Sequence, residues 1–102
     1  MSPNIVPEEF EQTMGCTVAD LLRALPAALP GAHIETDSDA HEVRGVFPDG
    51  MLRLVWQPMA ARRIALLEIP RLQVRFQYSR LSAERRHEVQ RRFDLATQRG
   101  GG

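Results

Sequence analysis

The chain has 102 residues, 43% of them hydrophobic and 25% charged, and its formal net charge is zero. This composition is typical of one soluble globular domain and excludes a disordered or fibrous chain. The longest wholly apolar run, residues 64–67, is far too short to span a membrane. A single cysteine excludes an internal disulfide and any site built from several thiolates. We therefore expect residues 1–102 to form one cytoplasmic domain.

The zero net charge hides a strong segregation of charge along the chain. All 13 basic residues are arginine, which excludes the lysine-dependent chemistry of Schiff bases, phosphate loops and kinases. Residues 1–50 carry nine acidic side chains and two arginines, whereas residues 51–102 carry eleven arginines and four acidic side chains. This asymmetry predicts a basic binding surface or self-association, unless strands of the two halves interleave and the charges cancel. Arginine in place of lysine also indicates a GC-rich bacterial source.

The first part of the chain predicts an irregular lead-in, a short strand and a helix. Residues 1–9 contain two prolines and form the lead-in. Residues 10–16 place apolar side chains two or four apart, which favours a strand, although the spacing of four also fits a helix. An amphipathic helix is expected from Thr17, whose hydroxyl can cap it, to Leu25, and Pro26 can end or kink it.

Residues 33–78 alternate between apolar and polar side chains in a way that predicts an antiparallel sheet. The expected strands lie around Ile34 and over residues 43–47, 51–56, 62–69 and 72–78. Pro-Asp-Gly at 48–50 is a strong turn signal. Pro58 should break its strand, and the run 62–69, apolar on both faces, is typical of a central strand. Pro70 marks either a tight turn or a kink in one long strand.

Ser82 is a good N-cap for a last helix over Ala83–Gln98, and residues 99–102 are expected to form a flexible tail. The order of the elements predicts a two-layer α+β domain, in which an antiparallel sheet of four to six strands packs against an N-terminal and a long C-terminal helix. This order resembles the helix-grip arrangement of lipid-transfer and related ligand-binding domains. The resemblance implies a curved sheet that wraps the C-terminal helix.

The reactive side chains form no catalytic or metal-binding motif that we can identify. His33, Asp37 and His41 belong to a run of histidines and acids that could bind zinc or manganese, but the spacing fits no known metal loop and favours a solvated turn. Cys16 precedes the first helix and could pair with a histidine, although a lone cysteine there is more typical of a small buried hydrophobe. We therefore expect no enzyme, no catalytic residue, no cofactor and no bound metal.

Arginines are expected on the surface of the sheet and of the last helix. If the aromatic side chains of the sheet face the helices, Arg53 and Arg75 point outward. Arg85 and Arg92 lie seven residues apart on one side of the last helix. These four residues are the candidate surface for an unknown protein partner, or for a second copy, held by salt-sensitive contacts. The outward face lacks aromatic side chains for base stacking, so nucleic-acid binding ranks third.

The alternative function is carriage of a small apolar ligand between the sheet and the C-terminal helix. The candidate pocket residues are the inward-facing aromatic residues Trp56, Phe76, Tyr78 and Phe93. The competing interpretation is that these rings simply fill the core of a short chain. The sequence thus favours a non-enzymatic interaction module first and a ligand carrier second.

Overall fold

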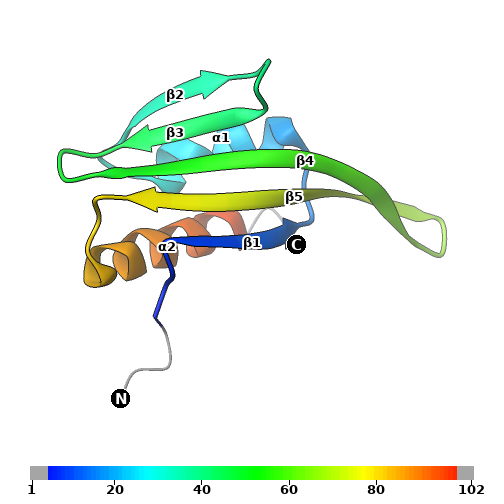
Figure 1. Cartoon of the computed structure of the whole chain (residues 1–102). Coiled ribbons are helices and arrows are strands. Elements are labelled where there is room, and N and C mark those ends of the chain that lie inside the picture. The colour runs from blue at the N-terminus through cyan, green and yellow to red at the C-terminus, as the bar shows by residue number, and fades with distance from the viewer. Residues whose placement is uncertain (1–4, 99–102) are drawn as a thin grey trace.

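The computed structural model describes residues 5–98, which form one antiparallel sheet and two helices (Figure 1). The elements in chain order are β1 Glu9–Met14, α1 Val18–Ala28, β2 His33–Asp37, β3 Glu42–Val46, β4 Met51–Ile64, β5 Leu67–Ser79 and α2 Ala83–Gln98. The strand order is β1-β5-β4-β3-β2, so β1 and β2 are the edges of the sheet. The predicted α+β class is confirmed. Residues 1–4 of the predicted lead-in and the predicted tail, 99–102, lie outside the described residues.

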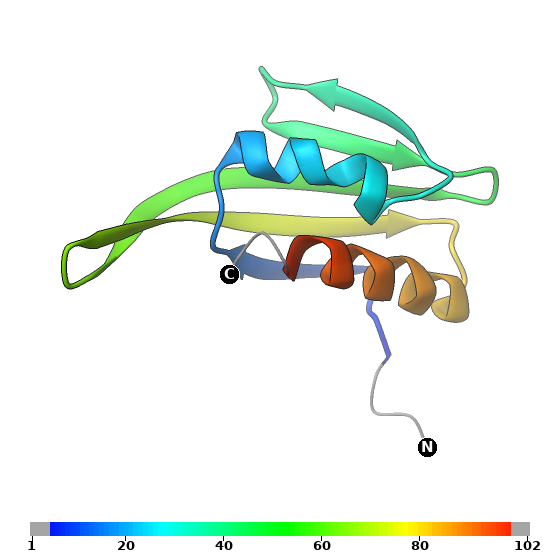
Figure 2. The same cartoon turned by 180° about the vertical axis from the view of Figure 1, so that it is seen from behind.

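Both helices cover the same face of the sheet, and the opposite face is open (Figures 1 and 2). Alternate side chains of β4 and β5 point to the helices, and Leu54 and Phe76 among them are fully buried. Phe10 of β1 stacks on Phe76 with ring centroids 4.7 Å apart, and Phe93 of α2 meets Phe76 edge to face at 5.1 Å. This cluster of three rings holds α2 against β5 and the edge strand β1.

The predicted cap of α1 is confirmed. The Asp20 amide donates to the Thr17 hydroxyl at 3.1 Å, and the Thr17 amide donates to the Asp20 carboxylate at 3.2 Å. The helix continues through Pro26 to Ala28, and Leu25 and Ala28 of its last turn are fully buried. The predicted strand over 10–16 is too long at its end, since β1 stops at Met14 and the next two residues bend toward the cap.

β4 and β5 are longer than predicted and form a hairpin that projects beyond the other strands and both helices (Figures 1 and 2). The prediction that Pro58 breaks its strand is wrong, and so is the central strand over 62–69. β3 pairs with β4 only as far as Val55, so Pro58 lies on an edge where a missing N–H interrupts no ladder. We call residues 58–71 the arm and the remainder of the described chain the body.

Pro70 kinks one long strand and does not form a tight turn. The register between β4 and β5 shifts beside it, because Met59 pairs with Arg71 whereas Arg62 pairs with Ile69. Two alanines of β4 therefore lie opposite Pro70 in a β-bulge. The bulge and the proline together let the arm bend away from the body.

Candidate functional site

Two of the arginines predicted to bind a partner are held by acidic side chains from the other half of the chain. On the open face of the sheet, Arg53 donates to Glu42 at 2.7 Å and Arg75 donates to Glu11 at 2.9 Å. The hydrogen bond from Arg53 lowers the pKa of Glu42, and the hydrogen bond from Arg75 lowers the pKa of Glu11. The charges of the two halves therefore offset each other on this face.

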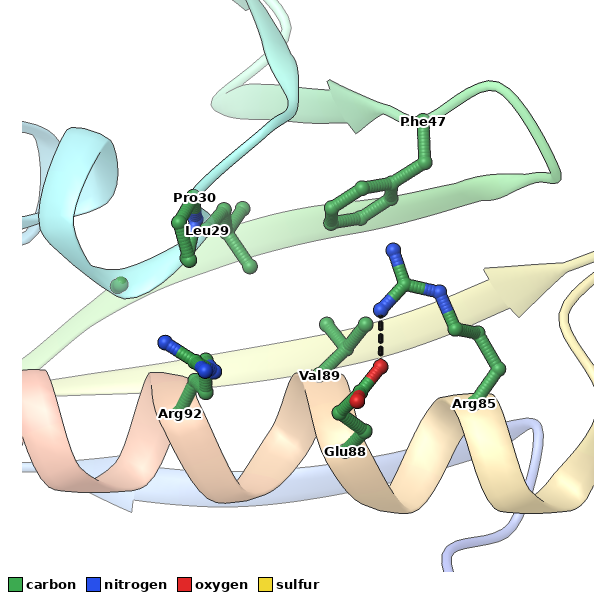
Figure 3. A pocket seen from close by; sticks show the side chains of 8 residues that line it. Leu29, Pro30, Phe47, Arg85, Glu88, Val89 and Arg92 are labelled. Carbon is green, nitrogen blue, oxygen red and sulfur yellow. Dashed lines mark hydrogen bonds and ion pairs between the residues drawn. The ribbon is translucent and has the colours of Figure 1, made fainter.

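Arg85 and Arg92 both project from α2, along one wall of a cleft of about 320 Å³ that α2 forms with the end of α1 and the β3–β4 turn (Figure 3). Arg85 donates to Asp49 and to Glu88, and its guanidinium lies 4.9 Å from the centre of the Phe47 ring. The structure thus separates the four candidate arginines into a pair on the open sheet face and a pair beside this cleft.

The four aromatic residues of the predicted ligand pocket lie in the packed core. Trp56 and Tyr78 are 4% and 5% exposed, and Phe76 and Phe93 are fully buried against each other. Burial raises the pKa of Tyr78 far above its ordinary value, so the phenol keeps its proton. Its hydroxyl donates to the side-chain oxygen of Gln90 at 2.6 Å. These side chains contact one another or other core residues.

The candidate reactive residues outside the core are Cys16 and the run 33–41. Burial, followed by the charge of Asp20, raises the pKa of the Cys16 thiol, which is the opposite of the shift that produces a nucleophile. In the run 33–41, the Asp37 carboxylate accepts a hydrogen bond from the Ala40 amide, as in a local turn. Within the described part of the chain, no three histidine, cysteine or acidic side chains lie together as a metal site.

A groove that the sequence did not predict runs between β1 and α2. It consists of two adjoining hollows of about 520 and 440 Å³, which share Gln12 and Asp94 in their linings. Phe10 and the half-exposed Leu95 line one end of the groove, and Met14 lines the other. The Phe10 end also carries His87 and Arg91, and the Met14 end also carries Thr97 and Gln98, so each end combines apolar and polar side chains.

In residues 5–98, the outer edge of β1, beside this groove, has no strand paired with it. The amide of Tyr78 donates to the carbonyl of Glu8 at 2.7 Å, which fixes the phase of the ladder between β1 and β5. Because bonded and non-bonded pairs alternate in an antiparallel ladder, the outward backbone groups belong to Glu9, Glu11 and Thr13. Among the described residues, β1 pairs only with β5, so this edge can accept another strand.

A chain of hydrogen bonds connects the core to the centre of the groove. The Tyr78 hydroxyl donates to Gln90, and the Gln90 amide donates to Oδ1 of Asp94 at 2.9 Å. This chain fixes the Asp94 carboxylate at the groove wall. At one end, Arg86 donates to the carbonyl of Val6 at 2.8 Å and ties the lead-in to α2. The groove therefore has a hydrogen-bond acceptor, the Asp94 carboxylate, held in place at its centre. At one end, Arg86 holds the lead-in against α2.

Sequence reasoning missed this groove for two different reasons. Leu95 lies outside the side of α2 that is buried at Val89 and Phe93, and an apolar residue away from that side was the available signal. The edge position of β1 has no such signal, because strand order depends on pairing between residues far apart in the chain.

Comparisons with known proteins gave no match. No protein-family model, no curated protein and no solved structure matches this chain. The resemblance to helix-grip domains is therefore not confirmed. In the described residues, neither helix is long and apolar enough to cross a membrane. The cytoplasmic location and the bacterial source stay predictions.

Proposed function

We propose that this chain is a non-enzymatic interaction module that binds an extended segment of a partner protein along β1. The observation that carries the proposal is the free edge of β1 beside a groove that α2 closes on its other side. A strand added to this edge satisfies the outward backbone groups of β1, and its inward side chains enter the groove. The proposed contact surface is therefore the edge of the sheet at β1. It is not the open face, where Arg53 and Arg75 are paired with acidic side chains.

The lining of the groove sets the sequence that such a segment needs. Inward side chains of a strand recur about every 6.6–6.8 Å, as Phe10, Gln12 and Met14 do on β1. An apolar side chain fits at the end beside Phe10 and Leu95, and another fits beside Met14. A lysine or arginine fits at the centre, where it can donate to Asp94. The preferred segment is apolar-x-basic-x-apolar.

The experiment is a selection of short linear peptides from a displayed random library, followed by affinity measurements on the peptides that are enriched. We expect this alternating pattern among them. Leu95→Glu should weaken binding about tenfold, because it removes an apolar contact and adds charge at the groove wall. Asp94→Asn should lower the preference for a basic central residue, and higher salt should weaken the wild-type interaction.

A matched pair of variants tests strand addition itself. Thr13→Pro removes an outward N–H of β1, whereas Thr13→Val keeps that N–H and removes the hydroxyl that donates to Gln73. The proline variant should lose affinity and the valine variant should not. Selection of peptides without the pattern, or equal affinity of both variants, contradicts the proposal.

Carriage of a small apolar ligand stays the second candidate, favoured by the cleft in Figure 3. Its volume of about 320 Å³ is near the lower limit for small-molecule sites. Leu29, Phe47 and Val89 supply an apolar lining, and Arg92 supplies a cation for a ligand that carries a carboxylate. A mass excess in the native protein that disappears on denaturation favours this candidate.

A further inference from the structure

The tip of the arm exposes apolar side chains that do not pack in the core. Leu66 is 101% exposed, Leu67 is 65% exposed and Ile64 is 46% exposed. The first turn residue, Ala65, has a φ of 55°, a conformation that favours glycine, asparagine or aspartate. A polar turn with glycine suits this backbone better, so the apolar tip indicates a contact outside the chain.

The edges of the arm oppose strand addition, unlike the edge of β1. β3 pairs with β4 as far as Val55, and Pro58 follows on the edge that becomes free there. β1 pairs with β5 as far as Leu72, and Pro70 lies on the edge that becomes free there. Prolines and bulges are common devices that protect such edges. The arm therefore offers the side chains of its tip, and not its backbone, to a partner.

The size and chemistry of the tip favour a lipid surface over a folded protein. Stable protein interfaces use about 20–30 residues on each side and are enriched in tryptophan, tyrosine and arginine at their centres. The apolar side chains exposed at the tip are all aliphatic, namely Ile64, Leu66 and Leu67. Acyl chains accept such side chains without a complementary shape, because the gain comes from the apolar area removed from water.

The charges behind the tip match an anionic lipid surface. The arm carries Arg62, Arg63 and Arg71 against the single acid Glu68, a net charge of +2. Arg63 pairs with Glu68 at 3.4 Å, and Nε of Arg71 donates to the carbonyl of Ala60 at 3.0 Å. Arginines set back from an inserted tip lie at headgroup depth, where each strengthens binding to anionic lipid.

We propose that the arm docks the chain on an anionic lipid bilayer. The side chains of the tip, with Leu66 foremost, enter the boundary of the acyl chains, and the arginines behind them bind the headgroups. The arm projects past the body at the end where β4 turns into β5, so the body does not block its approach (Figures 1 and 2). This membrane contact is separate from the groove along β1 and does not depend on it.

The test is flotation of the full chain with two kinds of vesicle. One is phosphatidylcholine alone, and the other is an equal mixture of phosphatidylcholine and phosphatidylglycerol. We expect binding to the mixture that falls with rising salt. The double variant Leu66→Glu with Leu67→Glu should lower partitioning at least about tenfold, because it removes apolar burial and adds two negative charges that anionic lipid repels. Arg62→Gln should lower it about fivefold.

Matched controls separate this proposal from a loss of folding and from the peptide-binding function. Arg23→Gln removes an exposed arginine of α1, and Leu95→Glu changes an exposed leucine of the groove, so both should partition like the wild type. Circular dichroism checks that every variant folds. Two outcomes overturn the proposal: no binding to the mixed vesicles, or equal binding by the double variant. If the first outcome comes with a dimer that the double variant abolishes, the tip is a contact between two copies of the chain.

Discussion

β4 and β5 run through both the body and the arm. Their residues in the body stabilise the fold, whereas their residues in the arm are exposed for contact with a partner. In the body, their inward side chains Leu54 and Phe76 are fully buried beneath the helices. In the arm, the same hairpin exposes Leu66 and Leu67, and its support comes from the pairing of β4 with β5 and from contacts within the arm such as Arg63 with Glu68. A two-stranded ribbon alone is marginally stable, so the body must supply the stability on which the arm depends. Because the body supplies the stability, the exposed residues of the arm can serve contact with a partner without a large effect on folding.

The largest expected effect is a difference in stability between two variants of the same hairpin, one at a buried ring and one at an exposed leucine. Phe76→Ala should lower the free energy of unfolding by about 3–5 kcal/mol, because it leaves a cavity between Phe10 and Phe93. Leu66→Ala should change it by less than about 0.5 kcal/mol, because the side chain has no neighbour to lose. Urea unfolding of both variants measures the difference. A similar loss in both would mean that the arm packs against something in solution.

The body was the part of the fold that the sequence predicted well. Residues 72–78 alternate cleanly, and alternation is decided by burial on one face of the sheet. Pro-Asp-Gly at 48–50 gave the turn between β3 and β4, and Ser82 gave the start of α2, where its hydroxyl accepts from the Arg85 amide. These signals are local, and each is confirmed by a local structure.

The arm was not predicted, because the sequence patterns of its residues are typical of other structures. Ala65 and Leu66 make a two-residue turn without the glycine, asparagine or aspartate that marks such turns. With no turn signal, the run 62–69 has the pattern of a buried strand, and Pro58 has the pattern of a strand end. The groove along β1 escaped for a different reason, since it depends on which strands become neighbours.

A smaller effect tests whether the turn of the arm is strained. Ala65→Gly should stabilise the arm by about 0.5–1 kcal/mol, because glycine adopts a φ of 55° without a clash. Hydrogen exchange of the arm amides should then slow about two- to fivefold, while exchange in the body stays the same. Ala61→Gly is the matched control, since its φ is not positive, and it should speed exchange in the arm. Equal behaviour of the two variants argues against strain at the tip.

The smallest expected effect concerns pH and tests the ion pairs on the open face of the body. Hydrogen bonds from Arg75 and Arg53 lower the pKa values of Glu11 and Glu42 below 4.5. A carboxyl whose pKa is lower in the folded than in the unfolded state stabilises the fold above the unfolded value, and this contribution is lost as the pH falls through the folded value. The free energy of unfolding should therefore decrease below about pH 4.5.

Removing those two carboxyls should make the decrease shallower. The double variant Glu11→Gln with Glu42→Gln no longer takes up protons at these sites on unfolding, so its stability should depend less on pH in this range. Thr13→Val is the matched control, because it alters the same open face without removing a titratable group. Urea unfolding across the acid range measures all three proteins. If the double variant keeps the full slope, the ion pairs of the open face do not hold these carboxylates, and the acid sensitivity of the body must come from other groups.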